Sequence, residues 1–147
     1  MSEGLHHKLL VQALLGEVRN PVEWDCHPFV YWDLEDENGV NVPPPNIQGS
    51  RPDILARDPS NRRVIIAEAK TSRDIDNRHT ETQLEAYFCY LSAFEKAELW
   101  LGVPWSCGGT ARRVAMKVRS SIGIDNIPMR IFDFLLGDHN FKRVWNG

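Results

Sequence analysis

Two strand-like stretches on either side of a short turn constrain the fold of this chain most. Residues 58–61 read Asp-Pro-Ser-Asn, which is the composition of a tight turn. The flanking stretches 52–57 and 64–70 are rich in Ile, Val, Leu and Ala, and they predict two strands paired antiparallel across that turn. The apolar residues just before Glu68 are typical of a strand that runs through a core.

Pairing about this turn gathers charged side chains at one end of the hairpin. It places Asp53 opposite residue 67 or 68, and side chains alternate along a strand, so Glu68 and Lys70 share one face. Ala67 and Ala69 take the other face. Two carboxylates this close are costly unless a positive charge lies between them. Lys70 supplies one such charge, but Mg²⁺ satisfies the geometry better, because it binds one or two carboxylates together with water and phosphate oxygens.

The remaining patterns predict an α/β domain that occupies residues 1–147. The expected elements are a helix over 5–18, a strand over 29–34, the two hairpin strands, a helix over 80–94, a strand over 97–103, a basic helix capped by Thr110 and a strand over 129–136. This order favours a mixed sheet, antiparallel in its first part and flanked by helices on both faces. A proline-rich loop is expected at about 35–50 and a short polar tail at about 138–147.

Composition excludes several classes of protein. Three cysteines without CxxC spacing argue against a disulfide scaffold, a zinc ribbon and a four-cysteine iron–sulfur cluster. No apolar run is long enough to span a bilayer, and the N-terminus lacks a signal-peptide pattern, so we expect a cytoplasmic protein without a membrane partner. The net charge of −3 is unusual for a protein that binds nucleic acid by bulk charge alone. Basic residues nevertheless cluster in 51–78 and 112–130, which leaves open either a phosphate-facing surface or ordinary solvated charge.

Three short motifs resemble those of a known nuclease superfamily. The sequence RPD at 51–53, followed by EAK at 68–70, resembles the PD-(D/E)XK signature of the restriction-endonuclease-like nucleases. In the next helix, QLEAY at 83–87 is similar to the QxxxY motif of the RecB-type branch, which includes phage exonucleases and CRISPR-associated nucleases. The expected order of elements also agrees with the αβββαβ core of that fold.

The resemblance implies a Mg²⁺-dependent deoxyribonuclease, with Mn²⁺ as a substitute, that hydrolyses phosphodiester bonds through a metal-activated water. It implies Asp53 and Glu68 as metal ligands, the main-chain carbonyl of Ala69 as a further ligand, and Lys70 as the catalytic lysine. It places Gln83 and Tyr87 near the active site, where they contact substrate or support Lys70. The alternatives are a structural ion pair on the sheet and a Gln/Tyr pair that only packs a helix. Flanking arginines suited to a backbone phosphate are Arg51, Arg73 and Arg78.

The first helix offers one more candidate ligand. RecB-type members often contribute a histidine or glutamate from that helix. On a helical wheel, His6 falls near the centre of the apolar stripe that includes Leu5, Leu9 and Leu14, while His7 lies at its edge. A polar residue on an inward face needs a partner, and the partner is either the metal site or an ordinary hydrogen bond.

Three functions follow from these patterns. The first is a DNA nuclease, which at this size would act as a homodimer or as a component of a larger DNA-processing, phage or defence complex. The second is a catalytically inactive nucleic-acid-binding or assembly protein with the same fold, and the third is a metal-dependent RNase. The tryptophans, which belong either to a core or to a base-stacking platform, are Trp24, Trp32, Trp100, Trp105 and Trp145.

Overall fold

A computed structural model describes residues 3–34, 42–137 and 140–147 of the chain. Its helices are α1 (Glu3–Val18), the short 3-10 helix η1 (Pro21–Glu23), α2 (Arg78–Leu91) and α3 (Gly108–Ser121). Its strands are β1 (Phe29–Trp32), β2 (Ile54–Arg57), β3 (Arg63–Ala69), β4 (Lys96–Pro104), β5 (Met129–Leu135) and β6 (Phe141–Asn146). The six strands form one mixed sheet in the order β1-β2-β3-β4-β5-β6, which confirms the α/β prediction.

The predicted hairpin is present with the predicted register. Strands β2 and β3 pair antiparallel, and Ile54 lies opposite Ala67. The turn between them is closed by the Asp58 side chain, because its Oδ1 accepts a hydrogen bond from the main-chain N–H of Arg62 at 2.8 Å. Strands β1 and β2 are also antiparallel, whereas β3, β4 and β5 run parallel to one another, as a mixed sheet requires.

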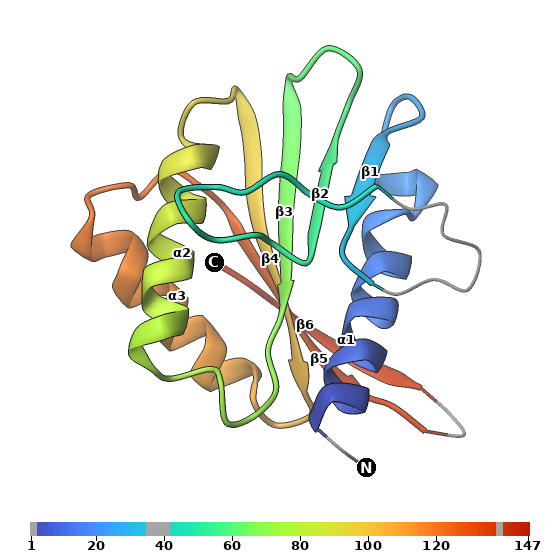
Figure 1. The fold of residues 1–147 in the computed structure, drawn as a ribbon, viewed down its shortest axis with the longest axis vertical. Helices are drawn as coiled ribbons and strands as arrows, with labels where there is room; N and C mark the ends of the chain where they lie inside the picture. The colour runs from blue at the N-terminus through green and yellow to red at the C-terminus, as the bar shows by residue number, and fades with distance from the viewer. Residues whose placement is uncertain (1–2, 35–41, 138–139) are drawn as a thin grey trace.

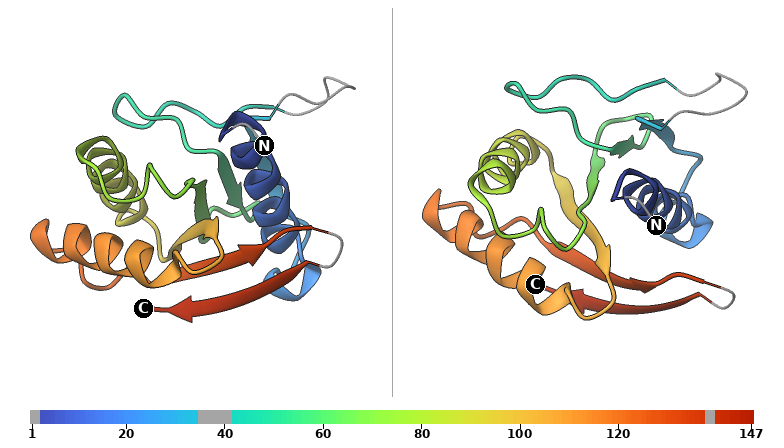
Figure 2. Two further views of the ribbon diagram at one scale, coloured as in Figure 1. Left: turned by 90° about the horizontal axis from the view of Figure 1, so that it is seen from below. Right: turned by 60° about the horizontal axis from the view of Figure 1, so that its bottom comes forward.

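Helices cover both faces of the sheet, and each face has its own core (Figures 1 and 2). Helix α1 packs on one face, where Leu10 and Leu14 share a core with Trp100. Helices α2 and α3 pack on the other face, where Leu84 shares a second core with Ile66. In the part of the chain that the structure describes, no helix is both long enough and apolar enough to cross a membrane.

The proline-rich loop crosses the α2 side of the sheet. Residues 35–41 of the predicted loop lie outside the described residues, and the remainder contains only an isolated bridge between Ile47 and Ser50. The chain runs across the sheet towards α2 and returns to β2 (Figure 1). Ile47 is buried in the same core as α2, and a tight turn with positive φ at Gln48 and Gly49 reverses the chain. The loop therefore covers part of the α2 side of the sheet through Ile47.

Two expectations for the last third of the chain are wrong. The polar tail expected at about 138–147 contains an edge strand, β6, which pairs antiparallel with β5. Its charged residues have partners on neighbouring elements, since Lys142 pairs with Glu17 and Arg143 with Asp133, so a polar pattern is compatible with a strand here. Helix α3 begins at Gly108 after Cys107 rather than at a Thr110 cap, and Cys107 makes no side-chain capping hydrogen bond.

The first two residues of α3 are glycines, Gly108 in a crowded position and Gly109 in an open one. Substituting each by alanine gives a matched pair of variants. A Cβ on Gly108 would lie 2.5 Å from both Asp133 Oδ1 and Trp145 Nε1, whereas a Cβ on Gly109 would meet nothing within 4 Å. We expect Gly108→Ala to lower the free energy of unfolding by about 1–3 kcal/mol through overpacking. Gly109→Ala should leave it unchanged or raise it by up to about 1 kcal/mol, because alanine is the better helix former. Urea denaturation measures both, and equal effects would contradict this account.

Candidate active site

The three residues expected to carry the chemistry converge at the carboxyl end of β3. Asp53 directly precedes β2, and its Oδ2 accepts a hydrogen bond of 2.8 Å from the main-chain N–H of Ala69. Asp53, Glu68 and Lys70 are all buried, with 9%, 4% and 8% of their surface exposed. Ala67 and Ala69 lie in the core under α1, so the predicted division of β3 into a polar and an apolar face is confirmed. Buried charges of this kind require partners, and each of the three contacts another group.

The Glu68 carboxyl is the most perturbed group of this cluster. Burial raises its pKa well above the ordinary range, and the neighbouring Asp53 carboxylate raises it further, while Lys70 acts in the opposite direction. Its Oε2 is buried and has no hydrogen-bond partner among the described residues. An orphaned carboxylate oxygen beside a second carboxylate is an acceptor site that a cation would satisfy.

Tyr87 lies beside Glu68 from the α2 side. Its side chain is fully buried, and burial together with the Glu68 charge raises the pKa of its hydroxyl. No hydrogen bond of regular geometry reaches that hydroxyl from the described residues, although the carboxyl of Glu68 is its neighbour. Of the two expected roles, this burial beside Glu68 favours support of the cluster over contact with a substrate.

Gln83 lies one helical turn before Tyr87 and contacts Lys70 directly. The Lys70 ammonium donates a hydrogen bond to Gln83 Oε1. The main chain of the same lysine is also anchored, since its N–H donates to the carbonyl of Gly102 on β4 at 3.0 Å. Two roles were expected for Gln83, substrate contact or support of Lys70. The observed hydrogen bond to Lys70 favours support of Lys70.

The first helix reaches the site through His7 rather than His6. His7 Nε2 lies 3.2 Å from Asp53 Oδ2, and this hydrogen bond is the main cause that raises the pKa of His7. Among the described residues, no hydrogen bond or ion pair joins His6 to the cluster. The reason is the rotation of α1: Val11 is fully buried, whereas Leu5 is 48% exposed. A stripe that included Val11 would have placed His7, one turn earlier, on the inward side.

The donor set fits a hard divalent cation. Within residues 3–34, 42–137 and 140–147, no group of three or more His, Cys, Asp or Glu side chains could hold a metal ion. Two carboxylates, Asp53 and Glu68, are instead available beside the main chain of Ala69. This set suits Mg²⁺ or Mn²⁺, which bind through few protein oxygens and complete their shells with water and phosphate. It does not suit structural zinc, which takes four nitrogen or sulfur ligands.

The flanking arginines expected to hold phosphate are exposed. Arg51 precedes the site on the loop into β2 and lies 3.9 Å from Asp33. Arg73 is exposed between β3 and α2, and Arg78 opens α2 with 87% of its side chain exposed, 3.7 Å from Glu81. Exposed pairs of this length are weak, so both Arg51 and Arg78 are available to a phosphate.

Most of the other basic residues are engaged within the molecule. Arg63 and Arg130 both pair with Glu23, and α3 pairs with the segment before α2 and with the first turn of α2. The pairs of α3 are Arg113 with Asp76 at 2.9 Å and Lys117 with Glu81 at 3.1 Å. Many basic residues of the clusters 51–78 and 112–130 therefore form ordinary ion pairs, and the arginines beside the site are the ones that remain as candidates for phosphate contact.

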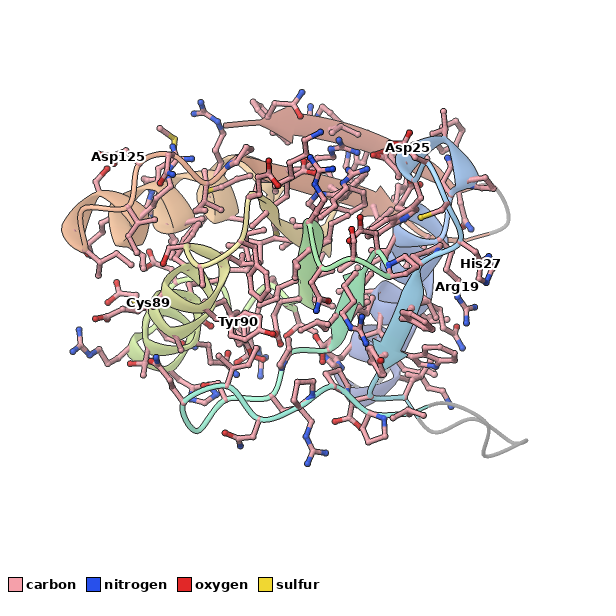
Figure 3. All side chains as sticks on the ribbon, turned by 90° about the horizontal axis from the view of Figure 1, so that it is seen from above. Arg19, Asp25, His27, Cys89, Tyr90 and Asp125 are labelled. Atoms are coloured by element: carbon pink, nitrogen blue, oxygen red, sulfur yellow. The ribbon has the colours of Figure 1, made fainter. Side chains whose placement is uncertain are left out.

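Two clefts among the described residues lie away from this cluster. A cleft of about 710 Å³ beyond the carboxyl end of α1 is lined by residues that include Arg19, Asp25 and His27. Figure 3 shows these three side chains together, apart from Cys89 and Tyr90 on α2. A second cleft, of about 670 Å³, also lacks Asp53, Glu68 and Lys70 in its lining. Buried carboxylates beside a lysine make this cluster the candidate site, because cleft size alone does not identify chemistry.

Comparison of the chain with protein-family models, with curated proteins and with solved structures gives no match. The functional assignment of the chain therefore depends on the geometry and chemistry of the site itself.

Proposed function

We propose that this protein is a divalent-metal-dependent deoxyribonuclease of the PD-(D/E)XK superfamily, close to its RecB-type branch. The observation that carries the proposal is the meeting of Asp53, Glu68 and Lys70 at the carboxyl end of β3, with Gln83 bound to the lysine. The order of elements from α1 to β4, one helix, three strands, a helix and a strand, matches the αβββαβ core of that fold. The fold alone is compatible with many functions, so the site has the greater weight.

Asp53 and Glu68 would hold the Mg²⁺ ion, with the Ala69 carbonyl as a further ligand. When bound, the ion would acidify a water molecule and polarise a phosphoryl oxygen. Asp53 is prepared for this role, since the Ala69 N–H and His7 fix one of its oxygens. The unpartnered Oε2 of Glu68 provides a second acceptor.

Lys70 would act on the negative charge that develops at the phosphate during hydrolysis. Its ammonium is buried and held by Gln83, so little reorganisation is needed when that charge appears. Water would supply the hydroxyl that bonds to phosphorus, and the bond to the leaving 3′ oxygen would break. The products would be a 5′-phosphate and a 3′-hydroxyl. The arginines Arg51, Arg73 and Arg78 would bind neighbouring phosphates of the DNA.

The proposal is tested by incubating the protein with linear, circular, single-stranded and branched DNA, and with RNA of the same sequence. Each substrate is tested with Mg²⁺, with Mn²⁺ and with EDTA. We expect cleavage of DNA that requires the metal and is abolished by EDTA. Binding without cleavage in either metal would favour an inactive binding or assembly protein, and cleavage of RNA alone would favour an RNase.

A further inference from the structure

Trp105 differs from the other tryptophans of the chain in its exposure. It directly follows β4, and 39% of its surface is exposed, whereas Trp24 and Trp100 are buried at 9% and 0%. Its main-chain N–H donates to the carbonyl of Phe134 on β5 at 2.9 Å, so its backbone is anchored to the sheet. An indole with this much free surface on an ordered backbone has no role in the core.

The Trp105 ring is held in place by an arginine that is itself fixed. The Arg143 guanidinium lies 5.0 Å from the centre of the Trp105 ring and 5.1 Å from that of Trp145. Two of its nitrogens donate to Asp133 Oδ2, at 3.0 and 2.8 Å, and Asp133 is fully buried. Cation–π contact and this buried ion pair together orient the indole before any ligand arrives.

The turn that carries Trp105 has a constrained backbone. Ser106 has a φ of 76°, which is uncommon for a residue other than glycine. Two residues later, Gly108 leaves no space for a Cβ beside Asp133. Such conformations persist where the surrounding structure imposes them, and they cluster at functional sites.

Trp105 lies on the same edge and the same face of the sheet as the catalytic cluster. Trp105 is in a turn, but its ring contacts Arg143, which pairs with Asp133. Asp133 alternates with Phe132 and Phe134 of the α1 core, so this contact lies on the α2–α3 face, which also bears Glu68. The main-chain N–H of Lys70 donates to Gly102, and the Cα of Trp105 lies at most about 10 Å from the Cα of Gly102. The Trp105 ring lies on the β6 side of this point, where it contacts Arg143, so a base stacked there belongs to a nucleotide some way along the strand from the cut. The turn after β4 and the end of β3 emerge on one side of the molecule (Figure 2).

We propose that Trp105 is a stacking platform for an unpaired base of single-stranded DNA whose backbone is cut at the Asp53–Glu68–Lys70 cluster. This inference rests on the proposed function and names its substrate class. A flat aromatic surface beside a cation binds a free base by stacking, and the bases of an intact duplex are already stacked on one another. Arg143 is neutralised by Asp133, so its part is to hold the ring in place rather than to attract phosphate.

The test measures binding of fluorescent oligothymidylate in EDTA, so that it does not depend on cleavage. We expect Trp105→Ala and Trp105→Leu to weaken binding by about tenfold, and Trp105→Phe to retain most of it. The leucine variant keeps an apolar side chain against Arg143, which guards against a folding defect. Phe29→Ala is the matched control, because Phe29 on β1 is also exposed and lies against an arginine, Arg57, at the end of β2 that is away from Asp53.

A second experiment tests whether Trp105 contacts one particular base of the oligonucleotide. One base at a time is replaced by an abasic unit in the oligonucleotide. At one position the wild type should lose about tenfold in affinity, and Trp105→Leu should lose almost nothing further. Equal binding by wild type and both non-aromatic variants would overturn the inference and leave the nuclease proposal intact. No binding of single-stranded DNA by the wild type would overturn the inference even if duplex DNA is cleaved, and failure to bind or cleave any DNA would overturn both.

Discussion

Replacement of Lys70 by alanine should abolish DNA cleavage and leave the fold and most of the DNA affinity in place. The ammonium lies at the carboxylate pair and is held by Gln83, so it is positioned to meet charge that appears only during the reaction. An interaction of this kind lowers the barrier rather than the dissociation constant. We expect the turnover number to fall by at least about 10²-fold, the usual effect of removing one group that stabilises such charge.

The control for this variant is Lys142→Ala. Lys142 also pairs with a carboxylate, Glu17, but on an exposed part of β6, so its removal should leave cleavage unchanged. Turnover, oligonucleotide binding and the thermal midpoint are measured for both variants. If Lys70→Ala lost thermal stability in proportion to activity, the lysine would be one half of a structural ion pair.

The hairpin that carries the site could be predicted because its determinants are local. The turn residues Asp58 and Asn61 set the pairing, and Asn61 has the positive φ, 59°, that asparagine tolerates. Once Ile54 faces Ala67, the next residues outward are Asp53 and Glu68. The patch of carboxylates follows from a register that a few neighbouring residues determine.

The rotation of α1, which decides which of its histidines faces the site, could not be predicted from the sequence in the same way. Apolar residues occur on nearly every side of this helix, so periodicity leaves its rotation open. The sheet decides the rotation, because Val11 and Leu15 are buried with Trp100 while Leu5 faces solvent. His7 reaches Asp53 as a consequence of that packing.

The last strand was missed for a related reason. The charges of β6 look like those of a solvated tail, but Arg143 is satisfied by Asp133, ten residues earlier on β5. From sequence alone, a charged residue is expected to be exposed, because its partner in the fold is not known. The pair of Arg143 and Asp133 also orients Trp105. The sequence therefore could not distinguish Trp105 from the other four tryptophans, and the structure could.

Metal binding should raise the thermal stability of the protein, and Asp53→Asn should remove that response. The Asp53 and Glu68 carboxylates are close and largely buried, and their mutual repulsion is only partly offset by Lys70. A ligand that binds only the folded state stabilises it by mass action, by about 1.4 kcal/mol at roughly ten times its dissociation constant. For a chain of this size that corresponds to a shift of about 3–6 °C in Tm.

Mn²⁺ is the better probe for this experiment, since Mg²⁺ dehydrates reluctantly and binds weakly until substrate phosphates complete its shell. Asp53→Asn removes one carboxylate charge and keeps an oxygen that can accept the Ala69 N–H, so its metal-free Tm should equal or exceed that of the wild type. Asp125→Asn is the matched control, because Asp125 is exposed between α3 and the start of β5. The cluster lies at the carboxyl end of β3, which is parallel to β5, and so at the opposite edge of the sheet. That control should keep the full Mn²⁺ response. An identical Mn²⁺ shift in the wild type and in Asp53→Asn would mean that the ion binds elsewhere on the protein, and the carboxylate pair would then have to be explained without a metal.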